Sequence, residues 1–299
     1  MLVPEGVEGV YHVVSRVVDR RMALGDEEKR HFVKLMKAYA GFSGIQVLAW
    51  CIMSNHFHML VAVPEQGELS DETVLKRMAM IYTPVQMAEI QVRLDAHPTP
   101  EGRREVFAPY ILRMGNLSLF MKTLKQRFSQ WFNPKHKRKG TLWEERFHST
   151  IVEYHGNTKP VSGSNREAAE VKSHAARIVA AYIDLNPVRA GMVEDPKDYM
   201  WSGYGAAVRG DKDGVRGIQA MWGGGKSDAL AAHRLLIYEE GQEKTQDGKT
   251  QDARTGETKK RMGIDAKKVW EERQRGGRLP LAVMLRLRVR YMTDGAIIG

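Results

Sequence analysis

The chain has 299 residues, enough for one large domain or two small ones, each with its own hydrophobic core. Its 46 Lys and Arg outnumber its 36 Asp and Glu, and the resulting net charge of +10 favours a polyanionic partner, either nucleic acid or a membrane surface. A single cysteine, Cys51, excludes an internal disulfide and any multi-cysteine zinc site. Neither a signal-peptide pattern nor a run of about 18 apolar residues occurs, so we expect a soluble cytoplasmic protein.

The first part of the chain predicts the order β-α-β-β. Residues 8–18 are rich in β-branched side chains and are typical of a strand. After Asp26, apolar residues recur at helical spacing. Two further apolar runs, 45–52 and 59–63, flank the turn-forming pair Ser54-Asn55 and predict a hairpin.

Two histidines follow this turn in the pattern His56-Phe57-His58. Residues i and i+2 of a strand point to the same face, so both imidazoles are predicted to lie side by side, with Phe57 in the core. Two neutral imidazoles at this spacing form half of a metal site. The alternative is a strand with two half-exposed histidines and no metal.

Residues 65–112 contain helix-compatible runs that are interrupted by prolines, and helices are predicted there. An amphipathic helix follows from Asn116, and a basic loop follows that helix. Residues 113–146 hold nine Lys and Arg against two Glu, which is +7 of the chain's +10. A solvated face is the alternative, but the local charge beside aromatic residues favours nucleic-acid contact. The predicted contacts in this region are Lys122, Lys125, Arg127, Lys135, Lys137, Arg138, Lys139, Trp143 and Arg146.

The second half of the chain predicts a strand over 147–154 and an alanine-rich helix over 167–185. Beyond residue 205 the composition changes, and we expect a partly disordered linker over 206–262. A small basic helical segment is predicted over 263–299. The main domain is therefore assigned to residues 1–205.

An ordered series of motifs resembles the single-tyrosine HUH transposases of insertion sequences, and especially the REP-associated tyrosine transposases. The resemblance covers roughly residues 7–64 and 113–205. The motifs that carry it are Tyr11-His12-Val13, Met53 to Val61, Gly140-Thr141-Leu142-Trp143, Arg146-Phe147, Tyr182 to Gly191 and Trp201-Ser202 with Tyr204.

The resemblance implies an α+β fold, in which helices pack on a ferredoxin-like antiparallel sheet of four to five strands. It further implies that residues 65–112 are a helical insertion and that the chain has a C-terminal extension. It also implies that Tyr182 is the catalytic nucleophile and that Asn186, four residues later, joins His56 and His58 in binding Mg²⁺ or Mn²⁺. Glu144 or Glu145 are weaker candidates for the third ligand. Arg16 and Arg189 are predicted to hold phosphate.

The function implied is a metal-dependent transposase that cleaves single-stranded DNA beside a hairpin, through a 5′-phosphotyrosine intermediate, in the nucleoid. The oligomeric state is left open between a monomer and a homodimer. One alternative is a catalytically silent DNA- or RNA-binding protein on the same scaffold. Another is a hydrolase of small phosphoesters, but such an enzyme does not need the net charge of +7 in residues 113–146.

Overall fold

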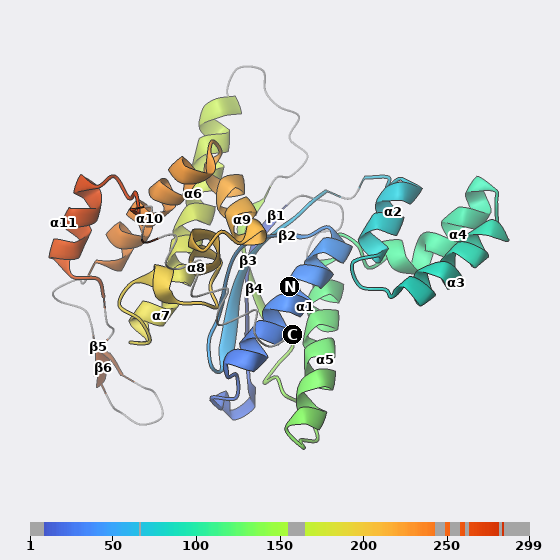
Figure 1. Ribbon diagram of the computed structural model, residues 1–299, viewed down its shortest axis with the longest axis horizontal. Helices are drawn as coiled ribbons and strands as arrows, with labels where there is room; N and C mark the ends of the chain where they lie inside the picture. The colour runs from blue at the N-terminus through green and yellow to red at the C-terminus, as the bar shows by residue number, and fades with distance from the viewer. Residues whose placement is uncertain are drawn as a thin grey trace. The chain divides into compact units, whose positions relative to one another are not determined.

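The computed structural model describes residues 9–65, 67–154, 165–242, 249–251, 258–260, 263–280 and 283. Four of its strands form an antiparallel sheet in the order β2-β3-β1-β4 (Figure 1). The strands are β1 (Gly9–Arg16), β2 (Gln46–Ile52), β3 (His56–Val63) and β4 (His148–Tyr154). With α1 (Asp26–Ser43) after β1 and α5 (Leu117–Lys135) before β4, the connectivity is β-α-β-β-α-β, so the predicted ferredoxin-like topology is confirmed.

The chain forms two compact units. The first comprises residues 1–47, 54–56 and 61–159, and the second comprises 48–53, 57–60 and 160–299. Strands β2 and β3 run through both. None of the described helices is long and apolar enough to cross a membrane.

In the first unit, α1 and α5 pack side by side (Figure 1). Their apolar stripes meet around Phe128, whose ring contacts Phe32 edge-on at a centroid distance of 5.2 Å and Trp143 at 5.8 Å. Aromatic pairs at such distances add to the stabilisation that burial alone provides. Helix α1 begins after Gly25, whose backbone N–H donates to the Glu28 carboxylate at 3.1 Å.

The predicted insertion is helical and has its own core. It contains α2 (Asp71–Met78), α3 (Pro84–Asp95) and α4 (Pro100–Ile111), and Figure 1 shows the three helices clustered together. The buried side chains of these helices pack against residues that flank the insertion, Phe42 and Met114. The insertion is therefore anchored to the first unit by apolar contacts, and the predicted helical character is confirmed.

The second unit is built from helices. They are α6 (Asn165–Asp184), α7 (Asn186–Arg189), the 3₁₀ turn Pro196–Asp198, α8 (Gly203–Val208), α9 (Lys212–Trp222), α10 (Lys226–Gly241) and α11 (Ala266–Gln274). The prediction of a linker over 206–262 is wrong for α9 and α10, because Ile218, Met221 and Ile237 are buried at 4% exposure or less. Within the same range, strands β5 (Lys249–Gln251) and β6 (Thr258–Lys260) pair antiparallel. Residues 284–299 of the predicted C-terminal segment lie outside the described residues.

Candidate active site

Strand β3 begins at the first of the two predicted histidines. Phe57 is fully buried and His58 is 6% exposed, while His56 is half-buried at the strand's start. The side chains of His56 and His58 alternate with that of Phe57 along the strand, as predicted, and so project from the face opposite to the phenylalanine.

Asn55 fixes the ring of His56. The Asn55 side-chain Nδ2 donates to the Arg20 carbonyl at 3.0 Å, which orients the amide so that its Oδ1 lies 2.6 Å from His56 Nδ1. An amide oxygen only accepts, so His56 Nδ1 carries the proton and Nε2 carries the lone pair. This is the tautomer in which an imidazole is a metal ligand through Nε2.

His56 is also held neutral. Burial, together with the positive charge of Arg16, lowers the pKa of His56 to about 4. At neutral pH the ring is therefore uncharged, as a ligand of a divalent ion must be.

The turn at Ser54-Asn55 binds a segment that follows β1 and carries backbone strain. Asp19 and Arg20 both have positive φ, 57° and 54°, in the left-handed region that is unfavourable for side chains larger than glycine. The segment is tied to the turn by the Val17 N–H, which donates to the Asn55 carbonyl at 2.8 Å, and by the Leu24 N–H, which donates to the Ser54 carbonyl at 2.9 Å. Asn55 thus links the histidine strand to the segment that follows the exposed Arg16.

Tyr182 lies on the last turn of α6 and is 39% exposed. Its ring stands perpendicular to that of His58, with 6.1 Å between the ring centroids. The guanidinium of Arg189 lies over the tyrosine ring, 4.8 Å from its centroid. Apolar neighbours in the sequence also suit a core tyrosine, but the side chain of Tyr182 is open to solvent and its ring faces His58, one of the predicted ligands.

The alternative candidates for the nucleophile are Tyr11, Tyr154, Tyr199 and Tyr204, and the side chain of Tyr154 lies outside the described residues. Tyr11 and Tyr204 are 1% exposed and Tyr199 is 5% exposed, and the Tyr199 hydroxyl donates to the Ile52 carbonyl at 2.6 Å. A nucleophile must reach a DNA phosphate, so exposure favours Tyr182 over these three residues.

Asn186 is the first residue of α7 and folds back on the end of α6. Its Nδ2 donates to the carbonyls of Tyr182 and Ile183, each at 3.1 Å. The amide nitrogen therefore caps the tyrosine helix, and contact with a metal is left to Oδ1. The predicted proximity of Asn186 to Tyr182 is confirmed, but its role as a ligand stays a prediction.

A buried polar chain anchors the helix end that carries Tyr182. Asp184 is 1% exposed and accepts from the Tyr204 N–H at 3.2 Å and from His233 Nε2 at 3.0 Å. Trp222 Nε1 donates to His233 Nδ1 at 3.2 Å, so the His233 proton is on Nε2. Burial raises the pKa of Asp184, and the His233 contact opposes that shift.

The predicted donors are of chemical types that suit a divalent ion, since Mn²⁺ accepts both imidazole nitrogen and amide oxygen. Among the described residues, no group of three or more His, Cys, Asp or Glu side chains is placed to hold a metal. Glu145 is instead 3.0 Å from His148, and the Glu144 N–H donates to the Arg16 carbonyl at 2.9 Å.

Two of the predicted DNA contacts are buried. Lys125 is 7% exposed and its Nζ donates to the Glu145 carbonyl at 2.6 Å, while burial lowers its pKa to about 8. Trp143 is 6% exposed and its Nε1 donates to the Lys125 carbonyl. Neither side chain presents a surface to DNA, so both assignments are corrected. Lys125 lies on the buried face of α5 because it is four residues after Met121 and three before Phe128.

The rest of the predicted basic surface is largely accessible. The positive charge of Lys135 is neutralised within the protein, because its Nζ contacts the carboxylates of Glu27 and Glu28. Lys137 and Lys139 are exposed and Arg138 is partly exposed, and none of these three forms an ion pair with a described residue. The other exposed candidates in this unit are Arg16, Lys122, Arg127 and Arg146.

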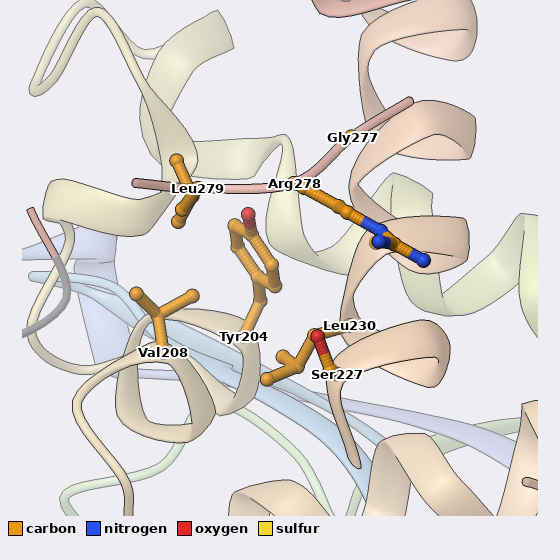
Figure 2. A pocket seen from close by; sticks show the side chains of 8 residues that line it. Tyr204, Val208, Ser227, Leu230, Gly277, Arg278 and Leu279 are labelled. Atoms are coloured by element: carbon orange, nitrogen blue, oxygen red, sulfur yellow. The ribbon is translucent and has the colours of Figure 1, made fainter. Parts of the chain in front are cut away.

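A pocket in the second unit lies between α8, α10 and residues 277–279, which follow α11 (Figure 2). Val208, Leu230 and Leu279 line it, together with the ring of Tyr204. The Tyr204 hydroxyl accepts a hydrogen bond from Arg234 Nη1 at 3.0 Å. The lining is mostly apolar and offers no acid–base pair, so the histidine strand and Tyr182 remain the candidate site.

A comparison with protein families finds a match over the strand that bears the histidines. Residues 7–81 match the sequence model of the family described as "Transposase IS200 like", a segment that includes His56 and His58 but not Tyr182. A solved structure described as a REP-associated tyrosine transposase bound to a REP hairpin aligns with 70% of this chain and 82% of its own, with 14% identity and a TM-score of 0.42. No curated protein matches the sequence.

Proposed function

We propose that this protein is a transposase-type enzyme that cleaves and rejoins single-stranded DNA, with Tyr182 as the nucleophile and a divalent metal at the histidine strand. The observation that carries the proposal is the exposed Tyr182 ring facing His58, on the strand that also bears His56. The IS200-like match supports a DNA-processing role, since it spans this strand.

The chemistry at Tyr182 is a phosphoryl transfer. The Tyr182 hydroxyl loses its proton and its oxygen bonds to the phosphorus, while the bond from phosphorus to the 3′ oxygen breaks and that oxygen takes up a proton. The product is a 5′-phosphotyrosyl enzyme and a free 3′-hydroxyl. Attack by another 3′-hydroxyl reverses the step and joins strands, and no nucleotide cofactor is required.

The residues around Tyr182 have separate roles in this step. Arg189, which lies over the ring, supplies positive charge beside the incoming phosphate. The Asp184–His233–Trp222 chain holds the end of the tyrosine helix in place. His56 Nε2, His58 and Asn186 Oδ1 would hold Mg²⁺ or Mn²⁺, which when bound polarises the scissile phosphate.

Asn55→Ala is expected to weaken Mn²⁺ binding by about 10- to 100-fold, the usual effect of removing a group that orients a ligand. The variant removes the acceptor that keeps the His56 proton on Nδ1 and the bond to the Arg20 carbonyl. Electron paramagnetic resonance of free Mn²⁺ measures the affinity without any DNA.

Asn133→Ala is the control, because its Nδ2 also donates to a backbone carbonyl, that of Gly140, in the same unit. It should bind Mn²⁺ as the wild type does. Equal affinities in Asn55→Ala and the wild type would show that Asn55 does not orient a ligand.

We propose that the substrate is a hairpin with a flanking single strand, as the resemblance to the REP-associated enzymes implies. Lys137, Arg138 and Lys139 form the accessible part of the basic loop after α5, and contacts from such residues to phosphates release counterions. The basic surface alone also suits a silent nucleic-acid-binding protein. Covalent trapping of DNA separates the two functions.

Replacing Lys137, Arg138 and Lys139 by alanine is expected to weaken DNA binding and flatten its salt dependence. The log–log slope should decrease by roughly 0.7 for each phosphate of a single strand that the variant no longer neutralises. Lys135→Ala is the matched control, since Glu27 and Glu28 already neutralise its ammonium, and its slope should stay near that of the wild type. An unchanged slope in the triple variant would show that the loop is a solvated surface that does not contact DNA.

A further inference from the structure

Helix α11 carries a tryptophan on its solvent side. Trp270 is 62% exposed, whereas Trp50, Trp143 and Trp201 are buried and the remaining two tryptophans are partly buried. At this exposure the indole presents an open aromatic face on which a base can stack. On the opposite side of α11, Val269 and Glu272 are 2% and 3% exposed, so the helix is amphipathic and Trp270 lies on its outer face.

The position of α11 is fixed by buried ion pairs. The Arg234 guanidinium donates to Glu272 through Nε at 2.8 Å and through Nη2 at 3.1 Å, and it also binds Asp195. Beyond the helix, Gly277 comes so close to the Ala231 carbonyl that a Cβ there would lie 2.2 Å from that oxygen. Figure 2 shows the chain continuing through Arg278 and Leu279 beside the pocket, with Leu279 next to Tyr204. Trp270 is thus held outward on a docked helix.

Cations flank the tryptophan on its own face. Lys267 is three residues before Trp270 and Arg273 is three residues after it, so both lie one turn away on the same stripe, and both are exposed. Arg273 is 3.3 Å from Glu239 in a pair that is about half exposed on both sides, a contact of small stability that a phosphate can displace.

The other cations of α11 and of its C-cap form ion pairs with glutamates. Lys268 pairs with Glu194 at 2.9 Å, and Arg275 pairs with Glu271 and Glu272 at 3.3 and 3.1 Å. The remaining exposed neighbours on the tryptophan stripe are Ala266 and Gln274, so no large apolar patch of described residues surrounds the ring on this helix. A protein-docking site of the usual kind needs such a patch, whereas one aromatic face between two cations matches a base with its flanking phosphates.

We propose that Trp270, Lys267 and Arg273 form a second contact site for single-stranded DNA, separate from the strand that bears the histidines. One base stacks on the indole, and the two cations contact the phosphates on either side. The inference rests on the proposed function in one respect, which is the choice of single-stranded DNA as the ligand. It gives α11 a role in holding single-stranded DNA.

The test is the affinity of the full chain for a fluorescein-labelled oligothymidylate in EDTA, where no cleavage occurs. Trp270→Ala should weaken binding by roughly 5- to 100-fold, the range for removing one base–aromatic stack. Trp270→Phe should retain part of the affinity. Trp270→Leu should behave like alanine, because it keeps apolar area but has no ring.

The charge contribution is tested in the same assay. The double variant Lys267→Ala/Arg273→Ala should reduce the salt slope by roughly 1.4, or 0.7 for each phosphate. Arg275→Ala, at the residue that caps the C-terminus of α11 and is paired with two glutamates, should leave the slope unchanged.

Several results overturn the inference. Unchanged affinity in Trp270→Ala, with normal binding by the wild type, removes this site and leaves the proposed function standing. Full affinity in Trp270→Leu excludes stacking. Loss of self-association in Trp270→Ala, measured by sedimentation and without an effect on DNA, assigns the face to a second copy of the chain. A wild type that binds no single-stranded DNA removes both this site and the proposed DNA substrate.

Discussion

Alanine at both His56 and His58 is expected to abolish cleavage of a hairpin substrate while hairpin affinity stays within a few-fold of the wild-type value. Cleavage needs the charge stabilisation of a metal that these imidazoles would hold. Affinity depends on the basic surface, which the substitutions leave intact. A denaturing gel measures cleavage with Mn²⁺ present, and a mobility-shift assay measures affinity.

Asn186→Ala should have a milder effect in the same assay, since it removes one ligand of several, and raised Mn²⁺ should restore part of the activity. The variant also removes two bonds to the end of α6, so its thermal midpoint is measured alongside. Full cleavage by the double histidine variant would contradict a metal at β3.

Tyr182→Phe is expected to reduce covalent attachment and cleavage to background. The change removes one oxygen and keeps the ring, so the contacts of the ring with His58 and Arg189 remain. If that oxygen bonds to phosphorus, no neighbouring acid or base can replace it. The measurement is a denaturing gel of a 3′-labelled hairpin with Mn²⁺, because a 5′-phosphotyrosyl bond retains the downstream fragment.

Tyr39→Phe on α1 is a matched control, a partly buried tyrosine on a helix of the other unit, and should leave cleavage unchanged. A labelled band of the size of the protein that persists in Tyr182→Phe would assign the chemistry to a different nucleophile.

Local spacing predicts the central features of the site. Two apolar runs around Ser54-Asn55 define the hairpin, and alternation along the strand puts His56 and His58 on one face. Likewise, the four-residue spacing from Tyr182 brings the Asn186 amide back to the carbonyl of Tyr182. These relations involve neighbours in sequence, so secondary structure alone determines them.

Features that depend on tertiary contacts could not be predicted in this way. The role of Asn55 follows from its bond to Arg20, 35 residues away, whereas its local sequence indicates only a turn residue. His233 pairs with Asp184 across 49 residues and lies in a segment whose composition predicts a linker.

Local sequence patterns also fail to predict which charged and aromatic side chains are buried. Lys125 satisfies its ammonium with the Glu145 carbonyl, 20 residues away. Trp143, which follows the basic loop, is predicted to stack with bases, but it packs against Phe32 of α1 and Phe128 of α5 instead. The exposure of Trp270 depends in turn on how the rest of α11 docks.

The most direct test of the central claim is to identify the residue that carries DNA. The wild-type protein is incubated with a hairpin substrate and Mn²⁺, the covalent complex is isolated and digested, and mass spectrometry locates the nucleotide adduct. We predict an adduct on Tyr182, linked through a 5′ phosphate. An adduct on Tyr11, Tyr154, Tyr199 or Tyr204, or cleavage without any adduct, would contradict the proposed mechanism.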